Sequence, residues 1–356
     1  MENAFYNLSE NLEGRDIGRW HVNERISHKA STGGFFSQGY AVVDEAGNTG
    51  FLKALDYTKA FRDGASIDTF NAMTNAYIFE RDLLNDCKTK KLRHVVTIID
   101  YGRFELPEGE KPEGKNCLPV DYIVLEKADR SVRDIIDISH SFDIAWMLRS
   151  LHNVAVGVEE LHGIQIAHQD IKPSNILVFD ESNTSKLGDV GRSTSFNRPA
   201  AHDSLNHSGD WGYAPIELLY GKILPDWKLR RFSCDMYMFG NLIVTYFNNV
   251  SLTAAIINML PKRFQPREWD GTYEEVLPTI ELVFSQCLDH FNQNLPERLR
   301  NDLILLVKQL CEPDVLKRGD TSMSTLGSQQ YSLRKYYTRL DVLARKYEYR
   351  LERMFV

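Results

Sequence analysis

Polar side chains able to handle phosphate groups are concentrated in the middle of the chain. Asp170, Lys172 and Asn175 lie in the stretch His-Gln-Asp-Ile-Lys-Pro-Ser-Asn, and Asp189 follows in Leu-Gly-Asp-Val-Gly. A carboxylate can orient the proton of an attacking hydroxyl, an ammonium can stabilise a transferred phosphoryl group, and amide and carboxylate oxygens are ligands for Mg²⁺. The pattern therefore predicts phosphotransfer, with Asp170 and Lys172 catalytic and Asn175 and Asp189 binding the metal. A merely solvated polar loop would explain these residue types poorly.

The spacing of these residues resembles the protein kinase family, whose pattern is H-R-D-x-x-x-x-N followed by D-F-G. The resemblance covers about residues 20–320. It implies an α+β, two-lobed fold: a small lobe with an antiparallel sheet and one helix, and a mainly helical large lobe, with ATP and Mg²⁺ between them. We expect four consecutive parts: a loose N-terminal lead-in (residues 1–18), the small lobe (19–126), the large lobe (127–325) and a C-terminal helical extension (326–356).

A glycine-rich stretch precedes these motifs, where the family covers the ATP phosphates. Gly33, Gly34 and Gly39 would let the backbone approach phosphate oxygens closely. The match to G-x-G-x-x-G-x-V is imperfect, because only Gly34 keeps its place in the best register. Taken alone, the stretch is also compatible with an ordinary hairpin turn.

An ion pair is expected next. Lys53, in Phe-Leu-Lys-Ala-Leu, resembles the strand lysine that holds the α- and β-phosphates. Its partner is expected on a helix over residues 68–87, where Glu80 is the only glutamate. The plainer interpretations are an edge-strand lysine and a solvent-facing glutamate. The long separation between the two residues suggests an extra loop around residues 58–67.

The strand over residues 121–128 resembles the one that enters the hinge between kinase lobes. By that resemblance, Leu125 guards the back of the adenine pocket, backbone groups of Glu126 and Ala128 hydrogen-bond the adenine, and Ser131 approaches the ribose. Backbone recognition leaves little side-chain signature, so these roles rest on the resemblance alone.

The activation segment is expected over residues 189–217, ending in Tyr-Ala-Pro-Ile-Glu. The resemblance implies a structural ion pair between Glu217 and Arg318, and it implies that Asp235 holds the catalytic-loop backbone. Residues 222–233 look like an insertion, and helices are expected at roughly 237–260, 273–291 and 297–312. The segment offers five hydroxyls for autophosphorylation: Ser193, Thr194, Ser195, Ser204 and Ser208.

Departures from the family pattern bear on regulation. Gln169 replaces the arginine that meets an activation-segment phosphate, so we expect activity without phosphorylation there. Val190 replaces the phenylalanine of D-F-G. Asp210 replaces a threonine and could pair with Lys172. Because no catalytic or metal-binding residue is lost, an active enzyme is favoured over a pseudokinase.

Asp-Ile-Lys in the catalytic loop is typical of kinases that phosphorylate Ser and Thr of proteins. Tyrosine or dual specificity is the first alternative. A small-molecule kinase of the same fold is the second, and Lys172, Glu217 and Arg318 argue against it. A pseudokinase scaffold that docks partners on the C-terminal helix is the third; the plainer interpretation of this basic, aromatic helix is that it packs on the large lobe.

Composition limits the remaining classes. The chain has 356 residues, 43% of them apolar, and a formal net charge of −7, which argues against a general nucleic-acid binder. The five scattered cysteines favour a reducing compartment over a disulfide framework. No apolar run has membrane-spanning length. We therefore expect a cytoplasmic enzyme that acts on protein substrates, in the style of a bacterial or phage-borne kinase.

Overall fold

The computed structural model divides into two compact units. The N-terminal unit comprises residues 1–129 and 189–191, and the C-terminal unit comprises residues 130–188 and 192–356. The structure describes most of each unit, in these ranges: 5–26, 37–61, 67–138, 143–179, 184–200, 202–322 and 329–354.

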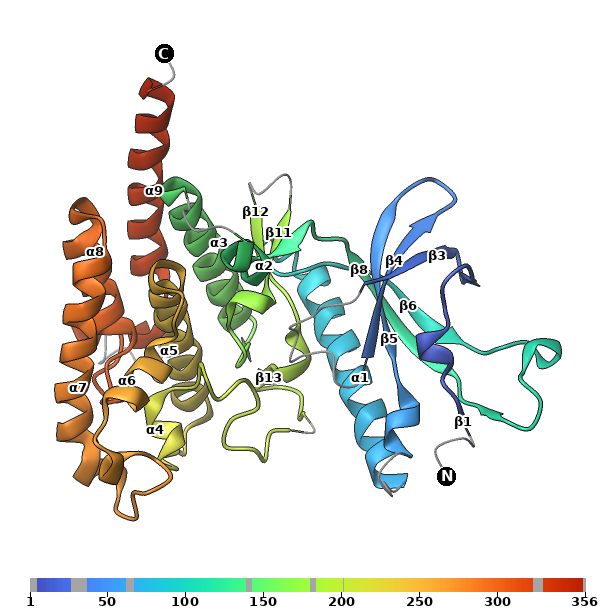
Figure 1. Cartoon of the computed structure of the whole chain (residues 1–356), viewed down its shortest axis with the longest axis horizontal. Coiled ribbons are helices and arrows are strands. Elements are labelled where there is room, and N and C mark those ends of the chain that lie inside the picture. Colours follow the sequence, from blue (N-terminus) through green and yellow to red (C-terminus); the bar gives the residue numbers. More distant parts are fainter. Residues whose placement is uncertain are drawn as a thin grey trace. The chain divides into compact units, whose positions relative to one another are not determined.

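The N-terminal unit is built on a six-stranded antiparallel sheet (Figure 1). Its strands, in spatial order, are β2 (Asp16–Ile17), β3 (Trp20–Ile26), β4 (Ser37–Asp44), β5 (Thr49–Leu55), β8 (Val120–Glu126) and β6 (Ile98–Phe104). Along β5 the buried positions alternate, so Leu52 and Ala54 face the core while Lys53 lies on the opposite face. Helix α1 (Ile67–Thr89) packs on this unit and buries Phe79, Glu80 and Leu83.

Residues 5–18 differ from the loose lead-in expected for them. β1 (Phe5–Tyr6) pairs in parallel with β7 (Asn116–Cys117), and the short helix η1 (Leu8–Glu10) follows. Leu8, Leu12 and Ile17 are buried in the same core cluster as Trp20. Apolar residues spaced this widely among polar ones show no helical or strand period, and only packing against the sheet reveals their role.

The C-terminal unit is mainly helical. Its helices are α2 (Val132–Ile138), α3 (Ile144–Gly163), α4 (Ile216–Leu219), α5 (Trp227–Asn248), α6 (Leu252–Met259), α7 (Tyr273–Asn294), α8 (Glu297–Leu310) and α9 (Arg334–Met354). Two small antiparallel sheets accompany them. One contains β9 (Arg130–Ser131), β11 (Ile176–Phe179) and β12 (Thr184–Leu187), and the other pairs β10 (Ile166–Ala167) with β13 (Thr194–Ser195).

Helix α5 forms the centre of this unit, and its bounds differ from those of the helix expected over residues 237–260. It begins at Trp227, inside the stretch expected to be an insertion, because Asp226 caps it by accepting from the Leu229 N–H at 2.8 Å. The single helix expected over 237–260 is broken, because Asn249 adopts a left-handed conformation and Ser251 caps α6. In the described part of the chain no single helix is long and apolar enough to span a membrane; α5 and α6 pass that test only together, and they are bent by 84°.

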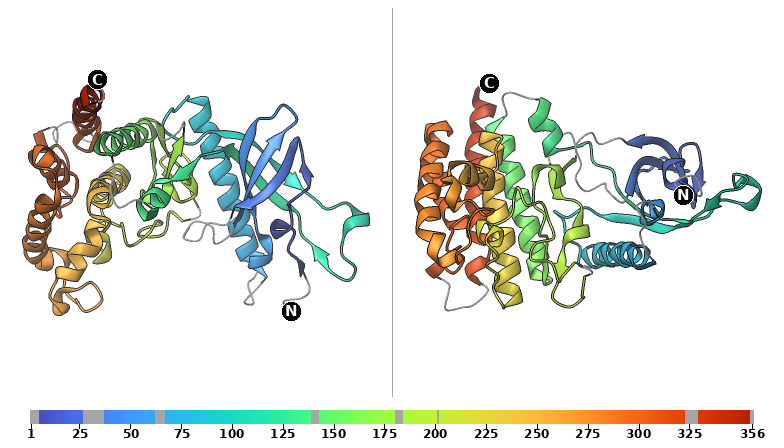
Figure 2. Two further views of the ribbon diagram at one scale, coloured as in Figure 1. Left: turned by 45° about the horizontal axis from the view of Figure 1, so that its top comes forward. Right: turned by 60° about the horizontal axis from the view of Figure 1, so that its bottom comes forward.

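Helix α9 lies along α3, as Figures 1 and 2 show from three directions. Its apolar side, including Tyr336 and Leu340, is buried. Arg149 of α3 adds ion pairs with Asp341 at 2.7 Å and Glu348 at 2.9 Å. The apolar side of the C-terminal helix thus packs on α3, which favours the packing interpretation.

Candidate active site

Lys53 is the centre of a charged cluster in the N-terminal unit. Its ammonium lies 2.7 Å from Glu80 Oε1, 2.9 Å from Glu80 Oε2 and 3.2 Å from Asp189 Oδ1. Burial by itself would lower the pKa of Lys53, but Asp189 and Glu80 outweigh burial and raise it. Strand β5, helix α1 and the turn after β12 thus hold a permanent cation between two carboxylates, and the expected Lys53–Glu80 pair is present.

The turn that carries Asp189 is tightly shaped. Asp189 has a φ of 48°, a left-handed conformation that aspartate tolerates better than most residues. A Cβ on Gly191 would lie 3.2 Å from Glu80 Oε2, so glycine lets the chain pass close to the ion pair. Val190, which replaces the family phenylalanine, is fully buried.

A second polar cluster surrounds Asp170 in the C-terminal unit. Asp170 Oδ1 accepts from the Asp210 N–H at 2.8 Å, and Oδ2 accepts from Asn175 Nδ2 at 2.9 Å. The Lys172 ammonium is 3.1 Å from Asp170 Oδ2 and 3.6 Å from Asp210 Oδ2. The carboxylate of Asp170 is therefore fixed from both sides, and the expected pairing of Asp210 with Lys172 is present.

Asp235 of α5 holds the backbone of the catalytic loop, as the resemblance implied. Its carboxylate accepts from the N–H groups of His168 and Gln169, both at 2.7 Å, and contacts His162 Nε2 at 2.9 Å. Burial acts to raise the pKa of Asp235, but the bond to His162 and the other donors prevail and lower it. A buried carboxylate satisfied in this way keeps the loop in one conformation.

The residues predicted to bind metal offer suitable oxygens. Asn175 Nδ2 donates to the Asp170 carbonyl at 2.8 Å as well as to its carboxylate, which leaves Oδ1 as the side chain's acceptor. Among the described residues no group of three His, Cys, Asp or Glu could hold a metal by itself. Mg²⁺ is typically bound through one or two carboxylates and the phosphates of a nucleotide. The Asn175 amide in the C-terminal unit and the Asp189 carboxylate in the N-terminal unit are each of a type that Mg²⁺ accepts.

Of the three glycines predicted to approach the ATP phosphates, Gly39 lies in the described part of the chain. Gly33 and Gly34 lie outside the described residues. Gly39 lies in β4 opposite Lys53. A Cβ on Gly39 would be 2.7 Å from the ring of Phe51, so packing in the sheet already explains why glycine is needed there.

The predicted adenine and ribose contacts lie at the end of β8 and beyond. Glu126 exchanges hydrogen bonds with Thr97: its N–H donates to the Thr97 carbonyl at 3.0 Å, and its Oε1 accepts from the Thr97 N–H at 2.8 Å. Ala128 follows the strand and is partly exposed. In the C-terminal unit, Ser131 donates through its N–H and Oγ to the Asp134 carboxylate at 2.9 and 2.7 Å, which anchors the start of α2.

The expected ion pair between Glu217 and Arg318 is present and buried. Arg318 has no exposed surface, and two of its nitrogens each donate to a Glu217 oxygen at 2.7 Å. Burial opposes the charge on Arg318, but Glu217 outweighs burial and raises the pKa of the guanidinium. Such a bidentate pair supports the unit without contributing chemistry.

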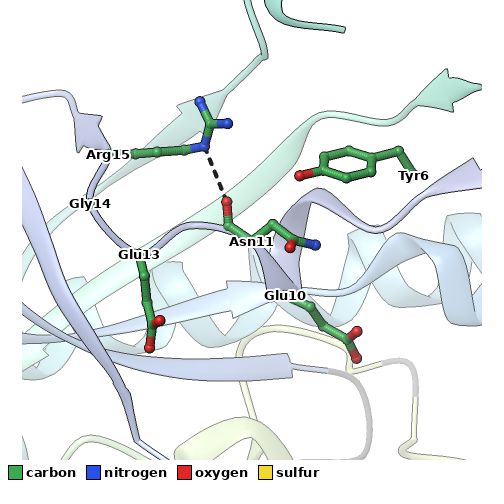
Figure 3. A pocket seen from close by; sticks show the side chains of 6 residues that line it. All are labelled: Tyr6, Glu10, Asn11, Glu13, Gly14 and Arg15. Carbon is green, nitrogen blue, oxygen red and sulfur yellow. Dashed lines mark hydrogen bonds between the residues drawn. The ribbon is translucent and has the colours of Figure 1, made fainter. Parts of the chain in front are cut away.

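An open hollow of about 510 Å³ on the N-terminal unit is separate from the predicted site residues (Figure 3). Its lining is polar: Tyr6, Glu10, Asn11, Glu13, Gly14 and Arg15. The Arg15 side chain there donates to the Asn11 carbonyl at 3.1 Å and pairs with Glu110 at 2.6 Å. None of the residues predicted to bind ATP or metal lines it.

Two contacts near the catalytic loop were not predicted from the sequence. Arg231 is buried against Gln169, but it lies in the stretch interpreted as an insertion. Gly209 approaches the Gln169 backbone so closely that a Cβ would lie 2.1 Å from that carbonyl oxygen. The glycine before Asp210 in the sequence could have indicated the close approach of Gly209 to Gln169. No local sequence pattern indicated the contact between Arg231 and Gln169.

Comparison with known proteins supports the kinase resemblance. The family model for the protein kinase domain matches residues 71–331. The eIF-2-alpha kinase GCN2 of Arabidopsis thaliana is 30% identical over 224 residues, which cover 55% of this chain and 17% of that protein. The serine/threonine-protein kinase SBK1 of Danio rerio is 44% identical over 96 residues, covering 27% of this chain and 24% of that one. The chain thus spans less than a quarter of these two relatives.

A solved structure confirms the expected fold. A chain of the yeast RNA Pol II CTD kinase CTDK-1 complex superposes with a TM-score of 0.56 at 18% identity, covering 90% of this chain and 93% of that chain. The antiparallel sheet of one unit and the helical build of the other agree with the α+β kinase fold.

Proposed function

The chain belongs to the protein kinase domain family, and on that premise we propose that it transfers the γ-phosphoryl group of ATP to serine and threonine hydroxyls of proteins. The observation that carries the proposal is the fixation of Asp170. Its carboxylate is held by the Asp210 N–H and the Asn175 amide, with the Lys172 ammonium 3.1 Å away. A base and a cation held this closely suit a reaction that depends on positioning.

Each side chain has a separate task in this proposal. Asp170 would orient the substrate hydroxyl and accept its proton, and Lys172 would stabilise charge on the transferred group. Lys53, kept charged by Glu80 and Asp189, would bind the α- and β-phosphates. Mg²⁺ held by Asn175 and Asp189 would neutralise phosphate charge.

The preference for serine and threonine rests on the Asp-Ile-Lys sequence of the loop. A relative that is 44% identical over 96 residues is named a serine/threonine-protein kinase, which supports the same preference here. Autophosphorylation is part of the proposal. Of the five candidate hydroxyls in the activation segment, Ser204 is the exposed one, whereas Ser193, Thr194 and Ser208 are buried, so Ser204 is the expected acceptor.

The direct test is incubation of the purified chain with γ-labelled ATP, Mg²⁺ and a general protein substrate, followed by mass spectrometry of the labelled residues. We expect label on serine and threonine. The Asp170→Asn variant should lose at least about 100-fold in rate, the usual scale for removing a general base. Asp270→Asn is the matched control, because Asp270 is an exposed aspartate of the same unit.

Two outcomes would contradict the proposal. Label on tyrosine alone would overturn the serine and threonine preference while leaving the kinase activity intact. Binding of ATP without transfer to any protein, by wild type and Asp270→Asn alike, would overturn the activity itself.

A further inference from the structure

Arg231 of α5 is a buried cation whose contacts are made with uncharged oxygens. The residue is 1% exposed. Its guanidinium donates to Gln169 Oε1 at 3.2 Å and to the Asp203 carbonyl at 3.3 Å, while its Nε finds no acceptor among the described residues. Burial, and then the neighbouring Arg230, lower the pKa of Arg231. Burying such a group is costly, so its position calls for an explanation.

The contacts of Arg231 join three parts of the C-terminal unit. The first is α5 itself. The second is the catalytic loop, because Gln169 returns a hydrogen bond from Nε2 to the Arg231 carbonyl at 2.9 Å, and the same Nε2 donates to Asp235 at 2.8 Å. The third is the activation segment, through Asp203. The Arg231 guanidinium therefore hydrogen-bonds both to Gln169, the residue before Asp170, and to Asp203, which lies more than thirty positions further along the chain.

The activation segment is pressed against the catalytic loop a few residues later. At Gly209 the chain passes so close to the Gln169 carbonyl that a Cβ would lie 2.1 Å from its oxygen, and a backbone atom cannot move aside cheaply. The next residue, Asp210, donates its N–H to Asp170. Ser208 Oγ also donates to the Arg192 carbonyl at 2.8 Å. The segment 203–210 therefore contacts Arg231 at its first residue, Asp203, and hydrogen-bonds to Asp170 through its last residue, Asp210.

We propose that Arg231 is a positioning residue, which fixes residues 203–210 so that Asp210 remains hydrogen-bonded to Asp170, and that it does so without any phosphate on the activation segment. The inference rests on the proposed kinase activity. The loop position that carries an arginine in the family pattern is Gln169 here, and Gln169 is instead the acceptor for a guanidinium supplied by α5. Arg231 is too deeply buried to receive a phosphate from solvent, so its donors serve the protein's own oxygens.

The test compares Arg231→Met with Arg230→Met in the full chain. Methionine fills similar volume but donates no hydrogen bond. Arg230 is the matched control, because it is the neighbouring arginine on the same helix and its Nε has no hydrogen-bond partner among the described residues. Amide hydrogen exchange of the peptide covering 203–213 should accelerate at least about 10-fold in Arg231→Met, with α7 unchanged. For phosphotransfer, kcat should fall about 10- to 100-fold with KM for ATP little changed, as expected from misplacement of a catalytic group.

Further variants keep the proposal testable if Arg231→Met does not fold. Gln169→Met breaks the same junction from the loop side and should give the same local acceleration of exchange. Arg231→Lys, which keeps the charge but loses the fork, should fall between wild type and Arg231→Met in both measurements. Phosphatase treatment of wild type should leave kcat and exchange of 203–213 within about two-fold of the untreated protein; a two-fold change in rate corresponds to less than 0.5 kcal/mol.

Exchange in 203–213 that is the same in Arg231→Met and wild type would overturn the proposal. So would a phosphatase effect as large as that of the substitution, because phosphate would then be the fixing element. If wild type transfers no phosphate to any protein, the proposed function fails, and the exchange comparison still decides whether Arg231 holds the segment.

Discussion

Three buried or partly buried basic side chains differ in the kind of oxygen that each one contacts. Lys53 lies between Glu80 and Asp189, and Lys172 lies between Asp170 and Asp210. Both are ammonium groups set among carboxylates, and in the proposed function both contact phosphate groups. Arg231 differs from these two lysines, because its donors go to neutral oxygens. In the proposals above, Lys53 and Lys172 serve chemistry, whereas Arg231 serves position.

A buried histidine of the activation segment predicts a pH dependence of stability. His207 is 3% exposed and packs edge-on against Trp211 at 5.2 Å between ring centroids. Burial lowers the pKa of His207 more than Asp170 and Asp210 raise it, and Arg231 also acts to lower it. The folded protein therefore favours the neutral ring, while the unfolded chain binds a proton near pH 6.5.

It follows that the unfolded state binds more protons below about pH 6.5, so the free energy of unfolding should fall as pH drops through that range. His202, whose pKa burial also lowers, acts in the same direction. The His207→Phe variant should lose less stability than wild type between pH 7.5 and 5.5, measured by urea unfolding at each pH. Equal losses in the two proteins would show that His207 does not contribute.

At the scale of elements, α5 and α9 decide how the C-terminal unit is built. α5 presents buried residues on every side and supplies Asp235 and Arg231 to the catalytic loop. α9 covers α3, the helix that leads into that loop. The C-terminal helix is therefore packed on the helix that precedes the catalytic loop.

The packing of α9 predicts a large effect from a single substitution. Leu340 is fully buried on the side of α9 that carries Tyr336. Leu340→Ala should lower the free energy of unfolding by about 2–5 kcal/mol, the usual cost of a cavity at a buried leucine. Val342→Ala on the same helix is the control, because Val342 is 39% exposed, and it should change stability by less than about 0.5 kcal/mol. Similar urea midpoints for the two variants would contradict this view of α9.

At the scale of the whole molecule, two compact units each hold one polar cluster. Residues 189–191 belong to the N-terminal unit although their sequence neighbours belong to the C-terminal unit. Through this short segment, Asp189 reaches Lys53 and forms part of the charged cluster of the N-terminal unit. The chain crosses from one unit to the other at the predicted metal-binding turn.

A ligand that binds the folded chain and not the unfolded chain stabilises the folded chain, so ATP·Mg²⁺ bound through Lys53 should raise the free energy of unfolding. At ATP·Mg²⁺ concentrations about 100 times Kd, the free energy of unfolding should rise by about 2.7 kcal/mol, which is visible as a higher Tm. In Lys53→Met the rise on adding ATP·Mg²⁺ should be much smaller, each protein being compared with its own ligand-free Tm. ATP with a chelator is the control for the metal. Equal increases in Tm for both proteins would exclude Lys53 from nucleotide binding.

The sequence by itself predicted the candidate catalytic and metal-binding residues and, through the resemblance to the protein kinase family, the fold and the pairs Lys53–Glu80 and Glu217–Arg318. The motifs are recognisable from residue types at fixed offsets, and the family resemblance relates motifs that lie far apart along the chain. The tertiary structure alone decided that residues 5–18 belong to a core, that α5 begins at Trp227 and that Arg231 meets Gln169. Each of these depends on burial and on contacts between residues far apart along the chain, which short-range patterns do not encode.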